Sequence, residues 1–427
     1  MKKLSKNLSH RIQLQMHNQI ETFRIAVRKF APFESAMQKF WDQYCIFSGC
    51  KLKLEMVVMD LHELYDSTIT KKGLAKGDFD IAHISTDWVL EGYTDHDFEV
   101  LNPYINKNKP DDFPRGWSKS LLSLQRFGWE IVGLPFHDGP ECFIYRKDLF
   151  ENETEKANYL AQYGKALEVP KTWEDFHQIA RFFNRPQDNL YGSIFACYPD
   201  GHNTVFDFCL QLWTRGGSLV DKNGFIQINT QAAVDGLNFY RKMVNDKTAV
   251  HPKSGEFESV AAGIAFSQGE AAMMINWFGF AAMCEVDPNS KVKGKIDVEL
   301  LPSSPDQKSA SLNVYWLYTI AKGSKHKAIA YDFLRFALTI EQDKQLTLEG
   351  GIGCRISTWK DEEINQIIPY YHKLEQLHEV ANMLPQKQNW AAIATIIDQM
   401  VLQAINTDVA TEELIQLAQN QINEIDK

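Results

Sequence analysis

The sequence predicts an α/β protein built from two or three domains or lobes. A chain of 427 residues is longer than a single compact domain usually is. Its residues are 44% apolar, and no region is too polar to fold. Strand and helix patterns alternate from residue 23 to residue 84. Strands that alternate with helices at this spacing pair in parallel, with the helices as crossovers.

The first five elements follow one another without long loops. Strand patterns cover residues 23–27, 52–59 and 77–84. The first helix starts at Pro32, where a missing N–H is harmless, and ends at Gly49. Residues 61–74 are expected to form the second helix. Residues 28–33 contain no glycine, so the phosphate-binding loops of dinucleotide and P-loop folds are disfavoured.

Later elements are expected from the same signals. Strands are expected at residues 129–136, 142–145, 191–197, 296–301 and 312–321. Hydroxyl caps are expected to start helices at Thr172, Thr230, Ser324 and Thr411. The tail from Trp390 is expected to be helical, and residues 269–275 also have helical periodicity. Five tryptophans on helix-like faces or at helix starts are expected in the core: Trp41, Trp173, Trp213, Trp359 and Trp390.

Composition disfavours several kinds of partner. A formal net charge of −10 disfavours nucleic acid. The seven cysteines match no zinc or redox motif, so we expect no metal or cofactor and mostly free, buried thiols, with a Cys45–Cys50 disulfide left open. Met1-Lys2-Lys3 resembles the start of a signal peptide, but residues 5–15 contain no apolar run. Export and a cytoplasmic location therefore both stay open.

A series of short motifs, in a fixed order, carries a resemblance to a known family. The motifs are residues 77–81, 87–88, 134–136, 145–150, 170–176, 212–217, 266–277, 312–322 and 353–355. In this order the chain resembles the extracellular solute-binding proteins of ABC importers, within the sugar-binding group that includes the maltodextrin binders. The resemblance covers residues 23–425.

The resemblance implies a type II periplasmic-binding-protein-like fold, in which hinge strands join two α/β lobes and the ligand lies in the cleft between them. It implies a lobe 1 of residues 1–140 and 275–317, and a lobe 2 of residues 141–274 and 318–427. It further implies a non-catalytic monomer that closes around a sugar or oligosaccharide. Such a protein delivers its ligand to the membrane permease of an ABC importer, in the periplasm or at the cell surface. The missing leader and the many cysteines depart from the family pattern.

A sugar presents hydroxyl groups around a ring with apolar faces, so its site needs aromatic plates and planar polar groups. Loops at strand ends supply such groups in open α/β sheets. The candidate ligand-binding residues are Asp87, Trp88, His137, Asp138, Glu141, Tyr198, Asp200, His202, Asn203, Asn276, Trp277, Trp316 and Arg355. Structural alternatives stay open, such as a helix cap for Asp87, core packing for Trp88 and an interlobe salt bridge for Arg355.

Two other functions compete with sugar transport. A glycoside hydrolase would pair two of the carboxylates Asp87, Asp138 and Glu141. The chain lacks the short catalytic motifs of serine hydrolases and zinc proteases, which weakens the case for an enzyme. A soluble sugar sensor with a signalling partner would fit the missing leader better. Whether the sugar is neutral or acidic stays open at this point.

Overall fold

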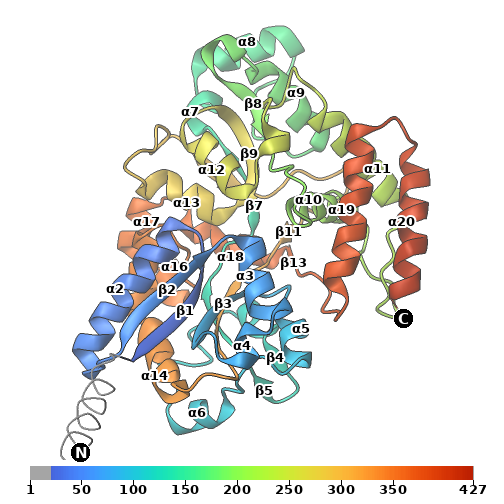
Figure 1. Cartoon of the computed structure of the whole chain (residues 1–427). Coiled ribbons are helices and arrows are strands. Elements are labelled where there is room, and N and C mark those ends of the chain that lie inside the picture. Colours follow the sequence, from blue (N-terminus) through green and yellow to red (C-terminus); the bar gives the residue numbers. More distant parts are fainter. Residues whose placement is uncertain (1–20, 427) are drawn as a thin grey trace, which may run out of the picture.

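The computed structural model describes residues 21–426, which form two β-sheets with helices around them (Figure 1). The segment considered as a leader lies outside the described residues. The first sheet has the strand order β2-β1-β3-β12-β6. Its strands are β1 (Thr22–Arg28), β2 (Lys53–Met59), β3 (Ile81–Ser85), β6 (Leu134–His137) and β12 (Trp316–Ile320). β1 pairs in parallel with β2 and β3, as expected, and β12 runs antiparallel between β3 and β6.

The second sheet has the order β10-β7-β9-β8. Its strands are β7 (Glu141–Tyr145), β8 (Tyr191–Ile194), β9 (Ala271–Trp277) and β10 (Asp297–Glu299). Two small ladders complete the strands: β11 (Ser311–Leu312) with β13 (Ala381–Asn382), and β4 (Arg126–Phe127) with β5 (Glu130–Ile131). We use lobe 1 and lobe 2 for the parts built around the first and the second sheet.

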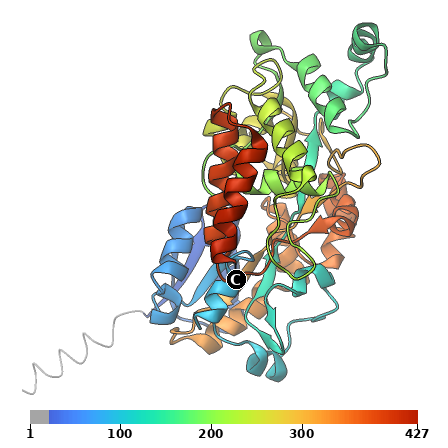
Figure 2. The same cartoon turned by 90° about the vertical axis from the view of Figure 1, so that its right-hand side faces the viewer.

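Helices surround both sheets, as the two views show (Figures 1 and 2). Those of lobe 1 are α2 (Ala31–Ser48), α3 (Leu61–Tyr65), α4 (Gly73–Lys76), α5 (Val89–Thr94), α6 (Asn102–Lys107), α14 (Lys327–Ala337), α15 (Ile340–Leu348), α16 (Ile356–Trp359), α17 (Glu362–Ile367) and α18 (Leu374–Glu379). Those of lobe 2 are α7 (Lys147–Phe150), α8 (Glu153–Tyr163), α9 (Trp173–Phe183), α10 (Asn203–Trp213), α11 (Gln231–Val244), α12 (Ser259–Ser267), α13 (Phe278–Val286), α19 (Trp390–Asn406) and α20 (Thr411–Ile425).

The packing shows which sheet each of the later segments joins. Strand β10 lies in the second sheet and α13 packs on β7, β9 and β10, although residues 275–317 were expected in lobe 1. Helices α14 and α15 pack on α2, although residues 318–427 were expected wholly in lobe 2. Helices α19 and α20 do pack in lobe 2, beside α10 and α11. Motif order does not reveal which sheet a segment joins, because that choice depends on contacts distant in sequence.

The helical pattern of residues 269–275 is misleading. Helix α12 ends at Ser267, Gly269 has a φ of +82°, and the chain then enters strand β9. Strand β9 lies between β7 and β8, and residues 271–276 are all buried. A strand buried on both faces reads as a continuous apolar run, in which periodicity does not separate strand from helix.

Several local expectations can now be compared with the structure. Thr172 and Thr230 accept cap hydrogen bonds from Asp175 and Ala233. Ser324 and Thr411 do not cap: the caps of α14 and α20 are His326 and Ala410. The expected helix 61–74 is instead α3, a π-turn (Asp66–Thr70) and the start of α4. Four of the five tryptophans expected in the core are buried, and Trp213 is half-buried.

The thiols and the membrane question have simple outcomes. All seven cysteines, which fall within the described residues, are free, so no Cys45–Cys50 disulfide forms in this structure. Among residues 21–426, the helices are too short or too polar to cross a lipid bilayer.

Candidate functional site

Two ion pairs link lobe 1 to lobe 2 at the ends of strands. Asp87 follows β3, and its Oδ2 lies 3.5 Å from Nε2 of His202 at the start of α10. Arg28 ends β1, and its guanidinium lies 3.9 Å from Glu258, which caps α12. Helix α12 packs on β9 of the second sheet. The lobes therefore face each other closely along these strand ends, which is the place where open α/β sheets bind ligands.

Asp200 orders the loop that carries His202. Its carboxylate accepts hydrogen bonds from the backbone N–H groups of His202 and Asn203 and from Nδ2 of Asn203. Burial lowers the pKa of His202, but Asp87 and Asp200 outweigh it and raise that pKa to about 9. His202 is therefore a cation at neutral pH, held against the Asp87 carboxylate.

Aromatic rings from both lobes surround these ion pairs. Trp88 meets Trp316 edge-on with ring centroids 5.8 Å apart, and it also lies 6.4 Å from the His202 ring. From lobe 2, Trp277 meets Phe206 edge-on at 5.6 Å. Trp88 is buried, whereas Trp277 and Trp316 are half-buried. We refer to these rings and ion pairs together as the interlobe site. Its residues are Arg28, Asp87, Trp88, Trp316, His202, Phe206, Glu258 and Trp277.

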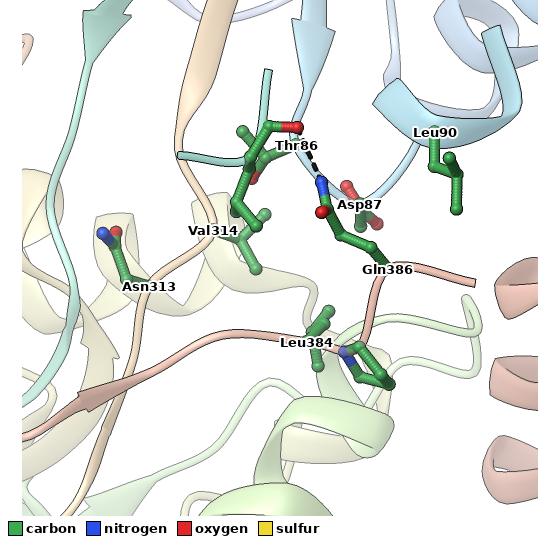
Figure 3. Close-up of a pocket in the computed structure, with 9 residues that line it drawn as sticks. Thr86, Asp87, Leu90, Asn313, Val314, Leu384 and Gln386 are labelled. Carbon is green, nitrogen blue, oxygen red and sulfur yellow. Dashed lines mark hydrogen bonds between the residues drawn. The ribbon is translucent and has the colours of Figure 1, made fainter. Parts of the chain in front are cut away.

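Several buried polar atoms beside the interlobe site have no hydrogen-bond partner among the described residues. They are Oδ1 of Asp87, Oε2 of Glu141, and both Oδ1 and Nδ2 of Asn313. Asp87 and Asn313 line a pocket of about 10 Å³, with room for about one water, together with Thr86, Leu90 and the loop 384–386 (Figure 3). Buried polar atoms are normally satisfied, so such a group of orphans indicates a missing partner such as a ligand or water.

Glu141 and Asp207 add two acids on the lobe 2 side. Glu141 pairs with Trp277 across β7 and β9, and Asp207 follows Phe206 on α10. Burial, and then the charge of Asp207, raises the pKa of Glu141 well above its usual range. Burial also raises the pKa of Asp207 to about 7, although Tyr240 donates a hydrogen bond to it. An added anion is therefore unfavourable here.

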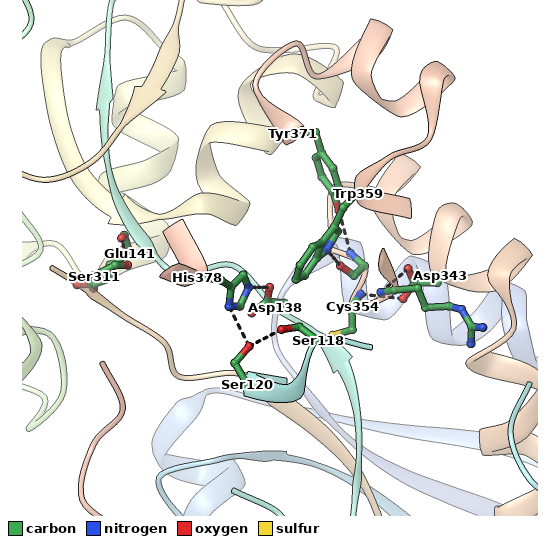
Figure 4. A network of polar contacts seen from close by, with 12 residues as sticks. Ser118, Ser120, Asp138, Glu141, Ser311, Asp343, Cys354, Trp359, Tyr371 and His378 are labelled. Carbon is green, nitrogen blue, oxygen red and sulfur yellow. Dashed lines mark hydrogen bonds and ion pairs between the residues drawn. The ribbon is translucent and has the colours of Figure 1, made fainter. Parts of the chain in front are cut away.

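His137 and Asp138 make hydrogen bonds within lobe 1, and Figure 4 shows the contact of Asp138 with His378. Asp138 is buried, and its Oδ2 lies 2.6 Å from Nε2 of His378, whose ring stacks on Trp359. Nδ1 of His137 accepts a hydrogen bond of 2.9 Å from the backbone N–H of Ile352. Burial lowers the pKa of His137 to about 4. The structure therefore uses these two residues to tie the end of β6 to α18 and to the loop before α16.

Arg355 is also remote from the interlobe site. It is 1% exposed and donates to the backbone carbonyls of Leu338 and Asp111. Its guanidinium lies over the Trp117 ring, 4.5 Å from the centroid. Its ion partner, Asp112, belongs to lobe 1 as well, so this ion pair is not an interlobe salt bridge.

Asn276 and Tyr198 are the two remaining candidates. Asn276 donates to the backbone carbonyl of Ser259 and accepts from the N–H of Trp277, so its amide braces β9 against α12. Tyr198 is 47% exposed, and its ring takes no part in the aromatic contacts of the interlobe site.

Sequence reasoning missed four contributors: Arg28, Phe206, Glu258 and Asn313. The signal for Arg28 is its place at the carboxyl end of β1. Asn313 lies beside β11, which pairs with β13 about 70 residues later, and Glu258 starts a helix. Nothing in the local sequence of either residue marks it as facing the other lobe.

Comparison with known proteins identifies the family. The model of the family described as "Bacterial extracellular solute-binding protein" matches residues 62–344, which is more than half of the chain. The chain belongs to this family. It is thus a solute-binding protein, and the expected non-catalytic role and two-lobed fold are confirmed.

Relatives with known ligands agree with this family. The arabinooligosaccharide-binding protein of Bacillus subtilis (strain 168) is 24% identical over 388 residues, or 87% of this chain and 83% of the relative. The maltose-bound MalE3 structure of T. maritima superposes with a TM-score of 0.83 at 20% identity, over 95% of this chain and 99% of that chain. A ribitol complex of a solute-binding protein from Agrobacterium radiobacter K84 superposes with a TM-score of 0.82 at 20% identity, over 95% of this chain and 98% of that chain.

The glycoside-hydrolase alternative loses its structural basis. Asp138 is bonded to His378 and Asp87 is paired with His202, so neither is a free partner for Glu141. The family to which the chain belongs also consists of non-catalytic transport receptors.

Proposed function

We propose that this protein binds a saccharide in the interlobe site and releases it to an ABC importer. The observation that carries the proposal is the presence, at one place, of tryptophan rings from both lobes and of buried polar atoms without partners. The rings suit the apolar faces of a sugar, and the orphan oxygens and amide suit its hydroxyl groups. Relatives named for arabinooligosaccharide, maltose and ribitol support the same ligand class.

The two interlobe ion pairs support a closing mechanism. Both join residues of opposite lobes, so opening the lobes would break them and expose the interlobe site. A ligand that touches both lobes would then favour the closed form by the difference in its affinity for the two forms. We propose that the protein works as a monomer in the periplasm or at the cell surface, and that the closed form docks on the membrane permease of the importer.

A thermal-shift panel tests the proposal. The panel contains arabinotriose, maltotriose, xylotriose, ribitol and mannitol, with an amino acid mixture as the control. A ligand that binds only the folded protein adds about 2.7 kcal/mol of stability at one hundred times its dissociation constant, which raises the midpoint by several degrees. A shift with one or more saccharides and none with amino acids is expected. No shift with any saccharide, or measurable hydrolysis of one, would contradict the proposal.

A further inference from the structure

The interlobe site has little free positive charge to offer a ligand. His202 lies 3.5 Å from the Asp87 carboxylate, and Arg28 lies 3.9 Å from Glu258. Burial lowers the pKa of Arg28 while three surrounding carboxylates oppose that effect: Glu258, Asp60 and Asp200. Each of these two cations therefore already faces an anion of the protein.

The unpartnered atoms beside the interlobe site are mostly acceptors. Asp87 Oδ1, Glu141 Oε2 and Asn313 Oδ1 are oxygens that can accept, and Asn313 Nδ2 donates. The raised pKa of Glu141 favours its protonated form, whose O–H can also donate. The hydroxyl groups of a neutral sugar donate to such oxygens and accept from the amide. A ligand carboxylate has no proton to donate, so it would leave the oxygens unsatisfied and lie against them.

The protein's own acids indicate how unfavourable a further anion is. Burial and the charge of Asp207 raise the pKa of Glu141, and burial raises the pKa of Asp207 to about 7. The same loss of solvation would act on a ligand carboxylate at this place, and an unpaired buried charge is strongly destabilising.

We propose that the interlobe site accepts uncharged polyhydroxylated saccharides and rejects saccharides whose carboxylate would lie against Asp87, Glu141 and Asn313. This inference rests on the proposed saccharide-binding function and specifies its ligand class. The selectivity comes from cations that protein carboxylates already counter.

Titration calorimetry at pH 7 tests this selectivity. The neutral probes are maltotriose and arabinotriose, and the acidic probes are trigalacturonate and maltotriose oxidised to the carboxylate at C6. At least one neutral probe is expected to bind about 100-fold more tightly than either acidic probe, which corresponds to about 2.7 kcal/mol. Equal or tighter binding of an acidic probe would overturn this inference and leave saccharide binding intact. Binding of none of the four would overturn both.

A matched pair of variants tests the cause. Asp87→Asn keeps the shape of the side chain but removes a carboxylate against which an acidic ligand would lie, so the preference for neutral over acidic saccharides should narrow at least tenfold. Asp408→Asn removes an exposed carboxylate between α19 and α20 and should leave the preference unchanged. An unchanged preference in Asp87→Asn would overturn the role assigned to the Asp87 carboxylate.

Discussion

At the scale of single residues, Trp277 lies where the second sheet meets the interlobe site. Its ring is half-buried and contacts Phe206. Trp277 is also the N-cap residue of α13, but its side chain makes no capping hydrogen bond. We expect Trp277→Ala to weaken saccharide binding about tenfold, because one aromatic contact is typically worth about 1–1.5 kcal/mol. Calorimetry measures the affinity, and circular dichroism checks that the variant is folded.

A control for this prediction is Trp129→Ala. Trp129 is 69% exposed in the turn between β4 and β5, so its loss should leave the affinity unchanged. An unchanged affinity in Trp277→Ala, together with lower stability, would return Trp277 to a purely structural role.

His202 makes stability depend on pH. Its pKa is raised to about 9 in the folded protein, against about 6.5 in an unfolded chain. The stabilisation by its positive charge is therefore complete below about pH 6.5 and is lost as the pH rises through about 9. We expect the free energy of unfolding of the wild type to exceed that of His202→Gln by on the order of 2 kcal/mol at pH 6. This difference should vanish near pH 10.

Urea unfolding of both proteins at the two pH values measures this excess. Comparison with His202→Gln cancels the effect of the other histidines that titrate in both proteins. One of these is His378, whose pKa is lowered by burial but raised overall by Asp138. If the difference in the free energy of unfolding between the two proteins is the same at both pH values, the charge of His202 does not contribute to stability.

The residues of the site could be predicted only in part. The structure brings Asp87, Trp88, His202, Trp277 and Trp316 together, and each lies at or next to the end of a strand or the start of a helix or strand. Their contact with a ligand stays a prediction. Arg28, Glu258 and Asn313 acquire their place through contacts between distant segments, which leave no local pattern in the sequence.

At the scale of elements, the loop between α15 and α16 is a structural joint of lobe 1. Asp343 on α15 accepts hydrogen bonds from the backbone N–H groups of Cys354 and Arg355 and from the Thr358 hydroxyl. Gly353 approaches so closely that an added Cβ would lie 2.3 Å from the Asp343 carboxylate. This joint could not be predicted from the sequence, because glycines such as those at residues 350–353 are equally compatible with a flexible loop and with close packing.

Arg355→Ala tests this interpretation. The change removes two hydrogen bonds to backbone carbonyls and the contact with Trp117, so we expect a loss of about 2–4 kcal/mol in the free energy of unfolding. The saccharide affinity of the folded protein should not change. A weakened affinity at unchanged stability would place Arg355 back in the ligand site.

Strand β9 shows what the sequence can and cannot predict about elements. Its type was missed because it lies at the centre of the second sheet, where both faces are apolar. The early strands β1, β2 and β3 were predicted well, because crossover helices and turn residues separate them.

At the scale of the whole molecule, the order of motifs was enough to predict the fold but not the lobe boundaries. The chain passes between the lobes at three places: where β6 leads into β7, where β11 leads into β12, and between α18 and α19. The first two passages span only a few residues. Such short connections allow one lobe to rotate against the other while each keeps its own sheet.

Small-angle X-ray scattering during a saccharide titration tests most directly whether a saccharide closes the lobes. We expect the radius of gyration to decrease as the saccharide identified by thermal shift is added, to saturate with the calorimetric binding curve, and to agree at saturation with the closed structure. A saccharide that binds without any change in the radius of gyration, or a protein that no saccharide binds, would contradict the account.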